Sequence, residues 1–142
     1  MKKSNRIYIF SIFIMILAFV GIQGCRKVSH NGSLDGQWQI IKIEDTSTGE
    51  ISEGTPHGYI SVNLHILQLR GLTSDMQTSN MRYDKEEGII DCDFPYVNAN
   101  DISKLLQPYG IYTNPVQFKI EKLSGEKLIL RTDHSIITCR KF

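Results

Sequence analysis

The region around Cys25 predicts a chemical modification more specifically than any other part of the sequence. Three basic residues stand among the first six, and an almost unbroken apolar run follows over residues 7–22. Gly24 then supplies a small residue directly before the cysteine. A basic head, an apolar run and a small-residue cleavage site together predict a secretory signal peptide. The pattern therefore predicts export of the chain and cleavage beside Cys25.

The tetrapeptide Ile22-Gln23-Gly24-Cys25 resembles the lipobox of bacterial lipoproteins. In that family the peptide is cut before the cysteine, whose thiol carries a lipid with acyl chains such as palmitate, so the resemblance implies lipidation of Cys25 and a membrane anchor. It also implies the outer membrane, because Arg26 stands where an aspartate retains some lipoproteins in the inner membrane. The lack of acidic residues over 26–30 favours the periplasmic side over the cell surface.

Two other interpretations of this segment stay open. An uncleaved transmembrane anchor normally needs about 20 apolar residues, and the run over residues 7–22 is shorter. A plainly secreted protein would keep Cys25 as an ordinary structural cysteine. Under the lipoprotein interpretation, the signal peptide is 1–24, the lipidated N-terminus and polar tether are 25–34, and the folded domain is 35–142.

The net charge of the chain changes when residues 1–24 are removed. The whole sequence has 16 Lys and Arg against 15 Asp and Glu, and three of the basic residues precede Cys25, which leaves 13 against 15 and a net charge of −2. Nucleic-acid binding would call for a basic face, so no nucleic-acid partner is expected. The 118 remaining residues suit one domain with a single modest core.

Cys92 and Cys139 are the two cysteines left if Cys25 is lipidated. A pair of cysteines in an exported chain can form a disulfide. The alternative is two thiols in separate strands, because the last strand of a meander pairs with the first strand and with its own predecessor. Neither cysteine has a Cys or His partner at metal-ligand spacing.

No other residues form a recognisable catalytic or metal-binding motif. Asp91 and Asp93 flank Cys92 and could suggest paired carboxylates, but on a strand both would point outward to solvent while Cys92 points inward. Neither a nucleophile motif nor a phosphate-binding loop is present. We therefore expect no enzyme activity, no metal and no cofactor. The four histidines, His30, His57, His65 and His134, lie apart in the sequence. Only His65 is expected inside a strand.

The elements that must position these residues are predicted to be β-strands. Residues 59–70 alternate apolar and polar side chains, as a half-buried strand does, and the phase changes after Ile66, which suggests a bulge or bend. A short helix is expected over 101–107, ahead of Pro108. The predicted strands, joined mostly by hairpin-length turns, cover residues 36–44, 59–70, 77–84, 89–94, 116–123, 127–132 and 136–142.

Gly36-Gln37-Trp38 at the head of the first strand resembles the Gly-x-Trp signature of lipocalins. The mature chain also resembles the small lipocalin-like lipoproteins of Bacteroidetes. The resemblance implies an all-β fold, a lipocalin-like antiparallel up-and-down β-barrel of about eight strands with one short helix. It further implies a structural latch in which Arg140 packs over Trp38, with Arg131 as a second candidate for the arginine.

Aromatic residues are the remaining candidates for a ligand site. Small barrels can enclose an apolar ligand, and the lining would come from Trp38, Tyr59, Tyr83, Phe94 and Phe118. Residues 95–115, rich in tyrosine, are the expected entrance. The alternative is that these rings pack a filled core. Two functions follow: non-catalytic binding of a small apolar ligand or envelope component, or a structural or protein-interaction module of the envelope whose protein partner is unknown.

Overall fold

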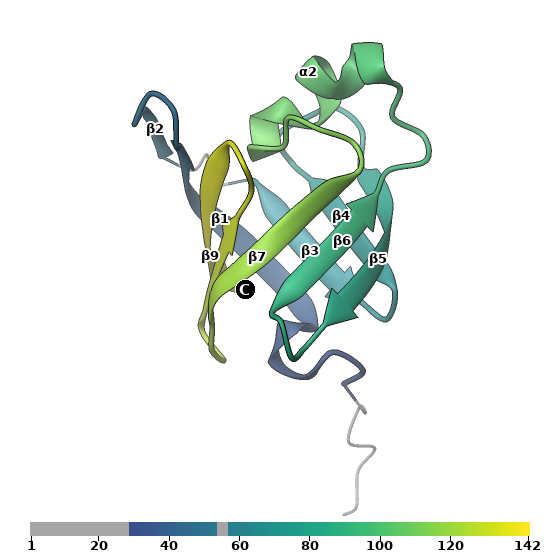
Figure 1. The fold of residues 1–142 in the computed structure, drawn as a ribbon, viewed down its shortest axis with the longest axis vertical. Coiled ribbons are helices and arrows are strands. Elements are labelled where there is room, and N and C mark those ends of the chain that lie inside the picture. Colours follow the sequence, from purple (N-terminus) through teal and green to yellow (C-terminus); the bar gives the residue numbers. More distant parts are fainter. Residues whose placement is uncertain (1–28, 54–56) are drawn as a thin grey trace, which may run out of the picture.

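Antiparallel β-strands make up most of residues 29–53 and 57–142, the part of the chain that this computed structural model describes (Figure 1). The strands are β1 (Gly36–Asp45), β2 (Ile51–Glu53), β3 (Tyr59–Asn63), β4 (Ile66–Arg70), β5 (Gln77–Asp84), β6 (Ile89–Asp93), β7 (Val116–Leu123), β8 (Lys127–Arg131) and β9 (Ser135–Lys141). The helical segments are η1 (Gly32–Leu34), η2 (Ala99–Asp101), α2 (Ile102–Leu105) and η3 (Gln107–Tyr109).

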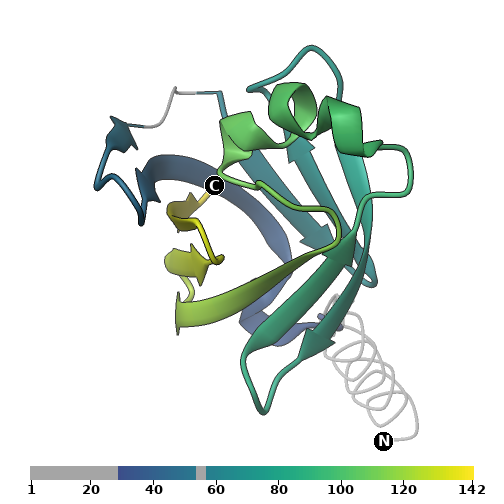
Figure 2. The ribbon, with the colours of Figure 1, turned by 45° about the horizontal axis from the view of Figure 1, so that its top comes forward.

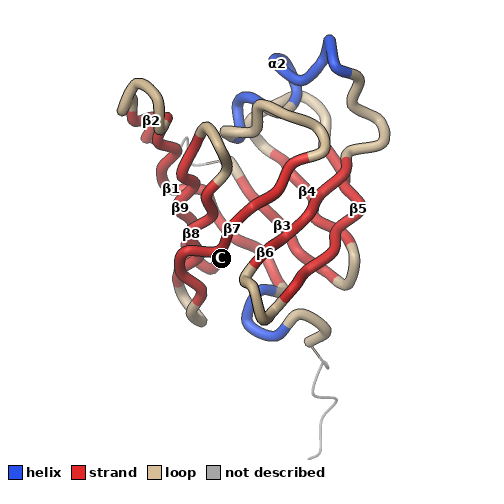
Figure 3. Tube along the Cα trace, viewed as in Figure 1, coloured by secondary structure: helices blue, strands red, loops and turns tan. Residues whose placement is uncertain are grey.

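Eight of these strands close into a barrel because β1 pairs on both of its edges. Its first half pairs with β3, where Trp38 lies opposite Ile60, and its other edge pairs with β9 along almost its whole length. The second half of β1 pairs instead with β2, so β2 forms an arm outside the ring of eight (Figure 3). The predicted fold class, a lipocalin-like antiparallel up-and-down barrel with one short helix, is confirmed.

Side chains fill the interior of the barrel. Alternate residues of each strand point inward, and the inward set is almost wholly apolar. Trp38, Phe94, Phe118 and Tyr109 are the bulkiest of the fully buried side chains. An eight-stranded barrel has an interior just wide enough for side chains to fill, and this core fills it with aromatic and branched aliphatic groups.

The segment predicted as one strand over 59–70 is two strands joined by a tight turn. Leu64 and His65 form the turn between β3 and β4, and Leu64 adopts a left-handed backbone conformation with φ of 54°. The change of apolar phase after Ile66 therefore marks a hairpin rather than a bulge or bend. A real bulge occurs in β1 between Ile40 and Lys42, and it turns Ile43 toward the core.

The two ends of the barrel are covered differently. The segment η2–α2–η3, which connects β6 to β7, lies over one end, which we call the mouth (Figure 2). Leu106 and Tyr109 from this segment are fully buried, and the backbone N–H of Leu72 donates to the Tyr109 hydroxyl at 3.1 Å. The helix expected over 101–107 is confirmed here as a mixture of 3₁₀ and α turns.

The opposite end, which we call the tether end, is covered by residues that were assigned to the tether. Asn31 is 5% exposed and Leu34 is fully buried. The amide Nδ2 of Asn31 donates to Asp35 Oδ1 at 2.6 Å and to the carbonyl of Leu64 at 2.8 Å. Asn31 and Leu34, which the sequence interpretation placed in the polar tether, therefore pack against this end of the barrel.

Candidate functional site

The aromatic residues predicted to line a cavity are not grouped around one. Trp38, Phe94 and Phe118 are packed within the core, and Tyr83 is half-buried at its edge. Tyr59 lies on the outer face, because its neighbour Ile60 points inward. Its ring contacts Phe142 edge-on at 5.2 Å between centroids, and the Arg70 guanidinium lies 5.7 Å from its centre.

The structural latch over Trp38 is made by Lys141, not by Arg140. The Lys141 ammonium lies 4.1 Å from the centre of the indole ring, and the indole N–H donates to the carbonyl of Leu34 at 2.8 Å. Lys141 is paired directly with Trp38 across β1 and β9, whereas Arg140 is paired with Gln39 and donates to its side chain at 2.8 Å. Arg131 instead forms an ion pair with Glu121.

Lys141 also closes the barrel floor electrostatically. Its ammonium donates to the backbone carbonyls of Ser33, at 3.2 Å, and Asp35. Burial lowers the pKa of Lys141, and the nearby carboxylate of Asp35 partly opposes that shift. A cation over an indole face contributes about 0.5–2 kcal/mol, with the larger value for desolvated pairs, so the latch stabilises the fold rather than serving a ligand.

Cys92 and Cys139 are both free thiols buried in the core. Cys92 lies on β6, which pairs with β5 and β7, whereas Cys139 lies on β9, which pairs with β8 and β1. The disulfide alternative is therefore wrong, for the topological reason that argued against it. Burial raises the pKa of each thiol to about 12.

Neither buried thiol is expected to react with the disulfide reagent DTNB in the folded protein at about pH 8, because the thiolate is the reactive species and both pKa values are about 12. In concentrated urea Cys92 and Cys139 should both react. A lipidated Cys25 would add nothing to that count. Counting thiols by absorbance with and without urea checks this, and fast reaction in the folded state would contradict the buried placement.

A cleft of about 450 Å³ opens at the mouth of the barrel. We call it the mouth cleft. Its walls come from the second half of β1, the β2 arm, the region around η3 and the first residue of β9. Its lining residues are Ile43, Asp45, Glu50, Ile51, Ser52, Gln107, Pro108, Tyr112 and Ser135. The tyrosine-rich stretch 95–115 contributes three of them, where an entrance was expected.

The polar groups of the mouth cleft are held by local hydrogen bonds. Asp45 accepts from the Ser47 hydroxyl at 2.6 Å and from the backbone N–H of Ser47 and Thr48, and these bonds lower the pKa of Asp45 to about 2. Burial, followed by the charge of Asp45, raises the pKa of Tyr112. At neutral pH the cleft therefore presents the carboxylate of Asp45 and the uncharged phenol of Tyr112, beside walls that contain both apolar and further polar residues.

Ser135 is the buried hydroxyl of the mouth cleft, and its hydrogen bonds are structural. Its Oγ donates to the carbonyl of Gly110 and lies 3.0 Å from the hydroxyl of Thr132. The bond to Gly110 fastens the start of β9 to the loop after η3, and the contact with Thr132 lies within the β8–β9 turn. A serine nucleophile needs an adjacent general base within hydrogen-bond reach, whereas the partners of Ser135 are a carbonyl and another hydroxyl.

A second cleft, of about 410 Å³, opens at the tether end. Ser29, His30 and Asp35 form one side of it, and the outer ends of β1 and β3 form the other, through Gly36 and Leu64 among others. The ring of His30 lies edge-on against His65, with 4.8 Å between centroids. His65 lies in the β3–β4 turn and not, as predicted, on the polar face of a strand.

The carboxylates on either side of Cys92 lie on the outer surface, as predicted. Asp91 accepts from the Arg82 guanidinium at 2.8 Å and from the side-chain amide of Gln117 at 2.9 Å. The amide and guanidinium hydrogen bonds lower the pKa of Asp91. Asp91 thus bridges β5, β6 and β7 as a carboxylate, a structural role.

Metal-binding residues do not gather in the described part of the chain. Within residues 29–53 and 57–142, no three His, Cys, Asp or Glu side chains form a group that could hold a metal ion. Among the same residues, no helical segment is long and apolar enough to cross a membrane. Cys25 and the predicted signal peptide over 1–24 lie outside the described residues.

The filled barrel, with its tryptophan at the head of β1 and its helical segment over the mouth, invites comparison with known families. The sequence profile of the lipocalin-like domain matches residues 17–142. The chain belongs to the lipocalin-like domain family. No curated protein matches this lipocalin-like chain.

Solved structures share the fold of this lipocalin-like chain. A lipocalin-like protein from Bacteroides uniformis is 19% identical and superposes with a TM-score of 0.63, over 78% of this chain and 100% of that one. An uncharacterized protein from Bacteroides eggerthii is 12% identical, with a TM-score of 0.60, over 77% of this chain and 99% of that one. At these identities the likeness establishes the barrel, not its ligand.

Proposed function

We propose that this lipocalin-like protein is a non-catalytic binding protein of the cell envelope, anchored through a lipid on Cys25 to the periplasmic side of the outer membrane. Its ligand is a small molecule with apolar surface, or the apolar part of an envelope component. The lipobox resemblance supports the anchor. Family membership supports a binding role. The ligand site is the mouth cleft, outside the barrel interior.

The mouth cleft is the observation that supports binding best. Ligand pockets usually have volumes of about 300–1,000 Å³ and combine apolar walls with a few polar groups. The cleft has a volume of about 450 Å³ and apolar walls from Ile43, Ile51 and Pro108. Its polar groups come from Asp45, Glu50, Ser52, Gln107, Tyr112 and Ser135. The barrel interior, in contrast, is occupied by Trp38 and the other core side chains.

Blocking the cleft should weaken binding of an apolar probe. Ile51→Trp adds bulk at a cleft position that is 51% exposed, so the fold should tolerate it. We expect the variant to bind the uncharged fluorophore N-phenyl-1-naphthylamine about tenfold more weakly, equivalent to about 1.4 kcal/mol. Fluorescence titration of the purified protein measures the affinity.

The matched control is Ile41→Trp, because Ile41 is 40% exposed on β1 and lies outside the lining of the cleft. Its affinity for the probe should equal that of the unchanged protein. If both substitutions weaken binding of the probe equally, or if neither weakens it, the mouth cleft is not the ligand site.

A second candidate function is a structural or protein-interaction module of the envelope. The filled core favours it, together with large apolar side chains that are exposed, such as Tyr96 at 87% and Met76 at 54%. Under this function the probe would bind weakly and independently of Ile51. The same titration therefore separates the two candidates.

A further inference from the structure

We infer that the tip of the β3–β4 hairpin, residues 64–66, contacts the headgroup layer of the membrane that holds the lipid anchor. This contact would set the barrel on the membrane with its tether end down and its mouth cleft facing away. The inference rests on the proposed lipidation of Cys25 and adds a second, non-covalent membrane contact made by the folded domain.

The length of chain between the lipid and the barrel keeps the tether end close to the bilayer. Only three residues separate Cys25 from Ser29. Ser29 is exposed but already fastened to the tether end, because its hydroxyl donates to the carbonyl of Gly32 and lies 3.1 Å from Asp35 Oδ2. Four residue steps span at most about 14 Å when fully extended. The barrel therefore cannot move far from the surface that carries its lipid.

The hairpin tip is fastened directly to the residues that begin the packed body. The side-chain amide of Asn31 donates to the carbonyl of Leu64 at 2.8 Å. The ring of His30 lies 4.8 Å from the ring of His65. The tip and the base of the tether thus form one unit, and whatever surface the tether reaches is also the surface nearest the tip.

Leu64 is an unusual residue type for its position in the turn. Two-residue hairpin turns with positive φ strongly favour Asn, Asp and Gly, yet a leucine with φ of 54° stands here. Its side chain is 53% exposed, and that of Ile66 is 43% exposed. A strained conformation that the core does not use points to a role outside the fold. The boundary layer of a bilayer is a medium in which exposed leucine and isoleucine are favourable.

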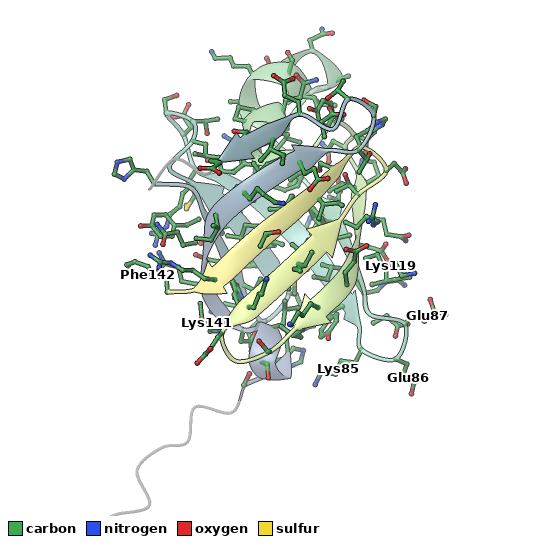
Figure 4. The ribbon with its side chains drawn as sticks, turned by 90° about the vertical axis from the view of Figure 1, so that its left-hand side faces the viewer. Lys85, Glu86, Glu87, Lys119, Lys141 and Phe142 are labelled. Carbon is green, nitrogen blue, oxygen red and sulfur yellow. The ribbon has the colours of Figure 1, made fainter. Side chains whose placement is uncertain are left out.

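We do not attribute this contact to charge, because the tether end has both positively and negatively charged side chains. Lys85, Glu86 and Glu87 occupy the β5–β6 turn there (Figure 4), and Lys141 is engaged with Trp38 and backbone carbonyls. A weak apolar contact is sufficient, since a short tether turns docking into an intramolecular event with a high effective concentration.

Site-specific quenching tests this orientation on the full, lipidated protein. Leu64→Cys and, separately, Ile66→Cys are labelled with the fluorophore NBD, and the protein is placed in vesicles of phosphatidylethanolamine and phosphatidylglycerol containing a lipid that is spin-labelled near the headgroup. The buried Cys92 and Cys139 should remain unlabelled. We expect several-fold stronger quenching at 64 and 66 than at a control label.

The control label is Met76→Cys, because Met76 is 54% exposed, close to the 53% of Leu64, but lies in the loop between β4 and β5 at the mouth. Strands of five to eight residues place this loop about 15–25 Å farther from the tether end. Equal quenching at all three positions, or none at any while the protein stays on the vesicles, overturns the contact. Absence of acyl mass on Cys25 in the intact protein would instead overturn the anchor itself.

Discussion

Trp38→Ala is expected to lower the free energy of unfolding by about 3–5 kcal/mol, the range for removal of a buried large aromatic side chain. Trp38 is fully buried in the core. The substitution also removes the hydrogen bond to the Leu34 carbonyl and the ring beneath the Lys141 ammonium. A single domain has only about 5–15 kcal/mol of stability in total, so the loss should be severe.

Equilibrium urea unfolding followed by circular dichroism measures this effect, since Trp38 is the one tryptophan of the chain and its fluorescence disappears with it. Tyr96→Ala is the matched control, because Tyr96 is 87% exposed and surface substitutions usually change stability by less than about 0.5 kcal/mol. A loss at Trp38 no greater than at Tyr96 would contradict the placement of the indole in the core.

Cys25→Ala is expected to move the protein from the membrane fraction to the soluble fraction of the envelope. Under the proposed function, the lipid on this thiol is the stable attachment, while the hairpin contact alone is too weak to hold the protein. Fractionation followed by immunoblotting measures the change. The intact mass of the unsubstituted protein should equal that of a chain that begins at Cys25 and carries acyl chains.

Cys92→Ala is the control for this experiment, because Cys92 is buried in the barrel and has no part in attachment. That variant should stay in the membrane fraction. Persistent membrane association of the Cys25→Ala variant would contradict the lipid anchor and favour an uncleaved transmembrane segment.

Much of the barrel could be predicted from local pattern. The inward placement of Cys92 between Asp91 and Asp93 is confirmed, and so is the short helix expected over 101–107, although Pro108 lies inside η3 rather than after the last helical turn. The hairpin at Leu64 could not be predicted, because its turn contains none of the glycine, asparagine or aspartate that normally signal one. Two strands with a leucine-histidine turn therefore resembled one long strand.

The identity of the latch residue illustrates a second limit of the sequence. Successive strand residues face opposite sides, so a shift of one residue in register exchanges the inward and outward sets. The pairing of Trp38 with Lys141 places the lysine over the indole and sends Arg140 to Gln39. The resemblance to lipocalins implied a latch from Arg140 or Arg131, whereas Lys141 makes it.

The mouth cleft could not be predicted from the sequence, for a topological reason. Ile43 is turned toward it by a bulge, Ile51 comes from an arm outside the barrel, and Tyr112 and Ser135 come from distant segments. No motif joins residues that meet only when the barrel closes. The one available signal was the tyrosine-rich connection over 95–115, which does form part of the cleft wall.

Native mass spectrometry of the protein purified from its own envelope tests ligand binding at the mouth cleft most directly. We predict a small molecule bound one to one in the unchanged protein and in Ile41→Trp, and lost from Ile51→Trp, in which the cleft is blocked. A bound mass retained equally in both variants, or absent from the unchanged protein in repeated preparations, would contradict the account.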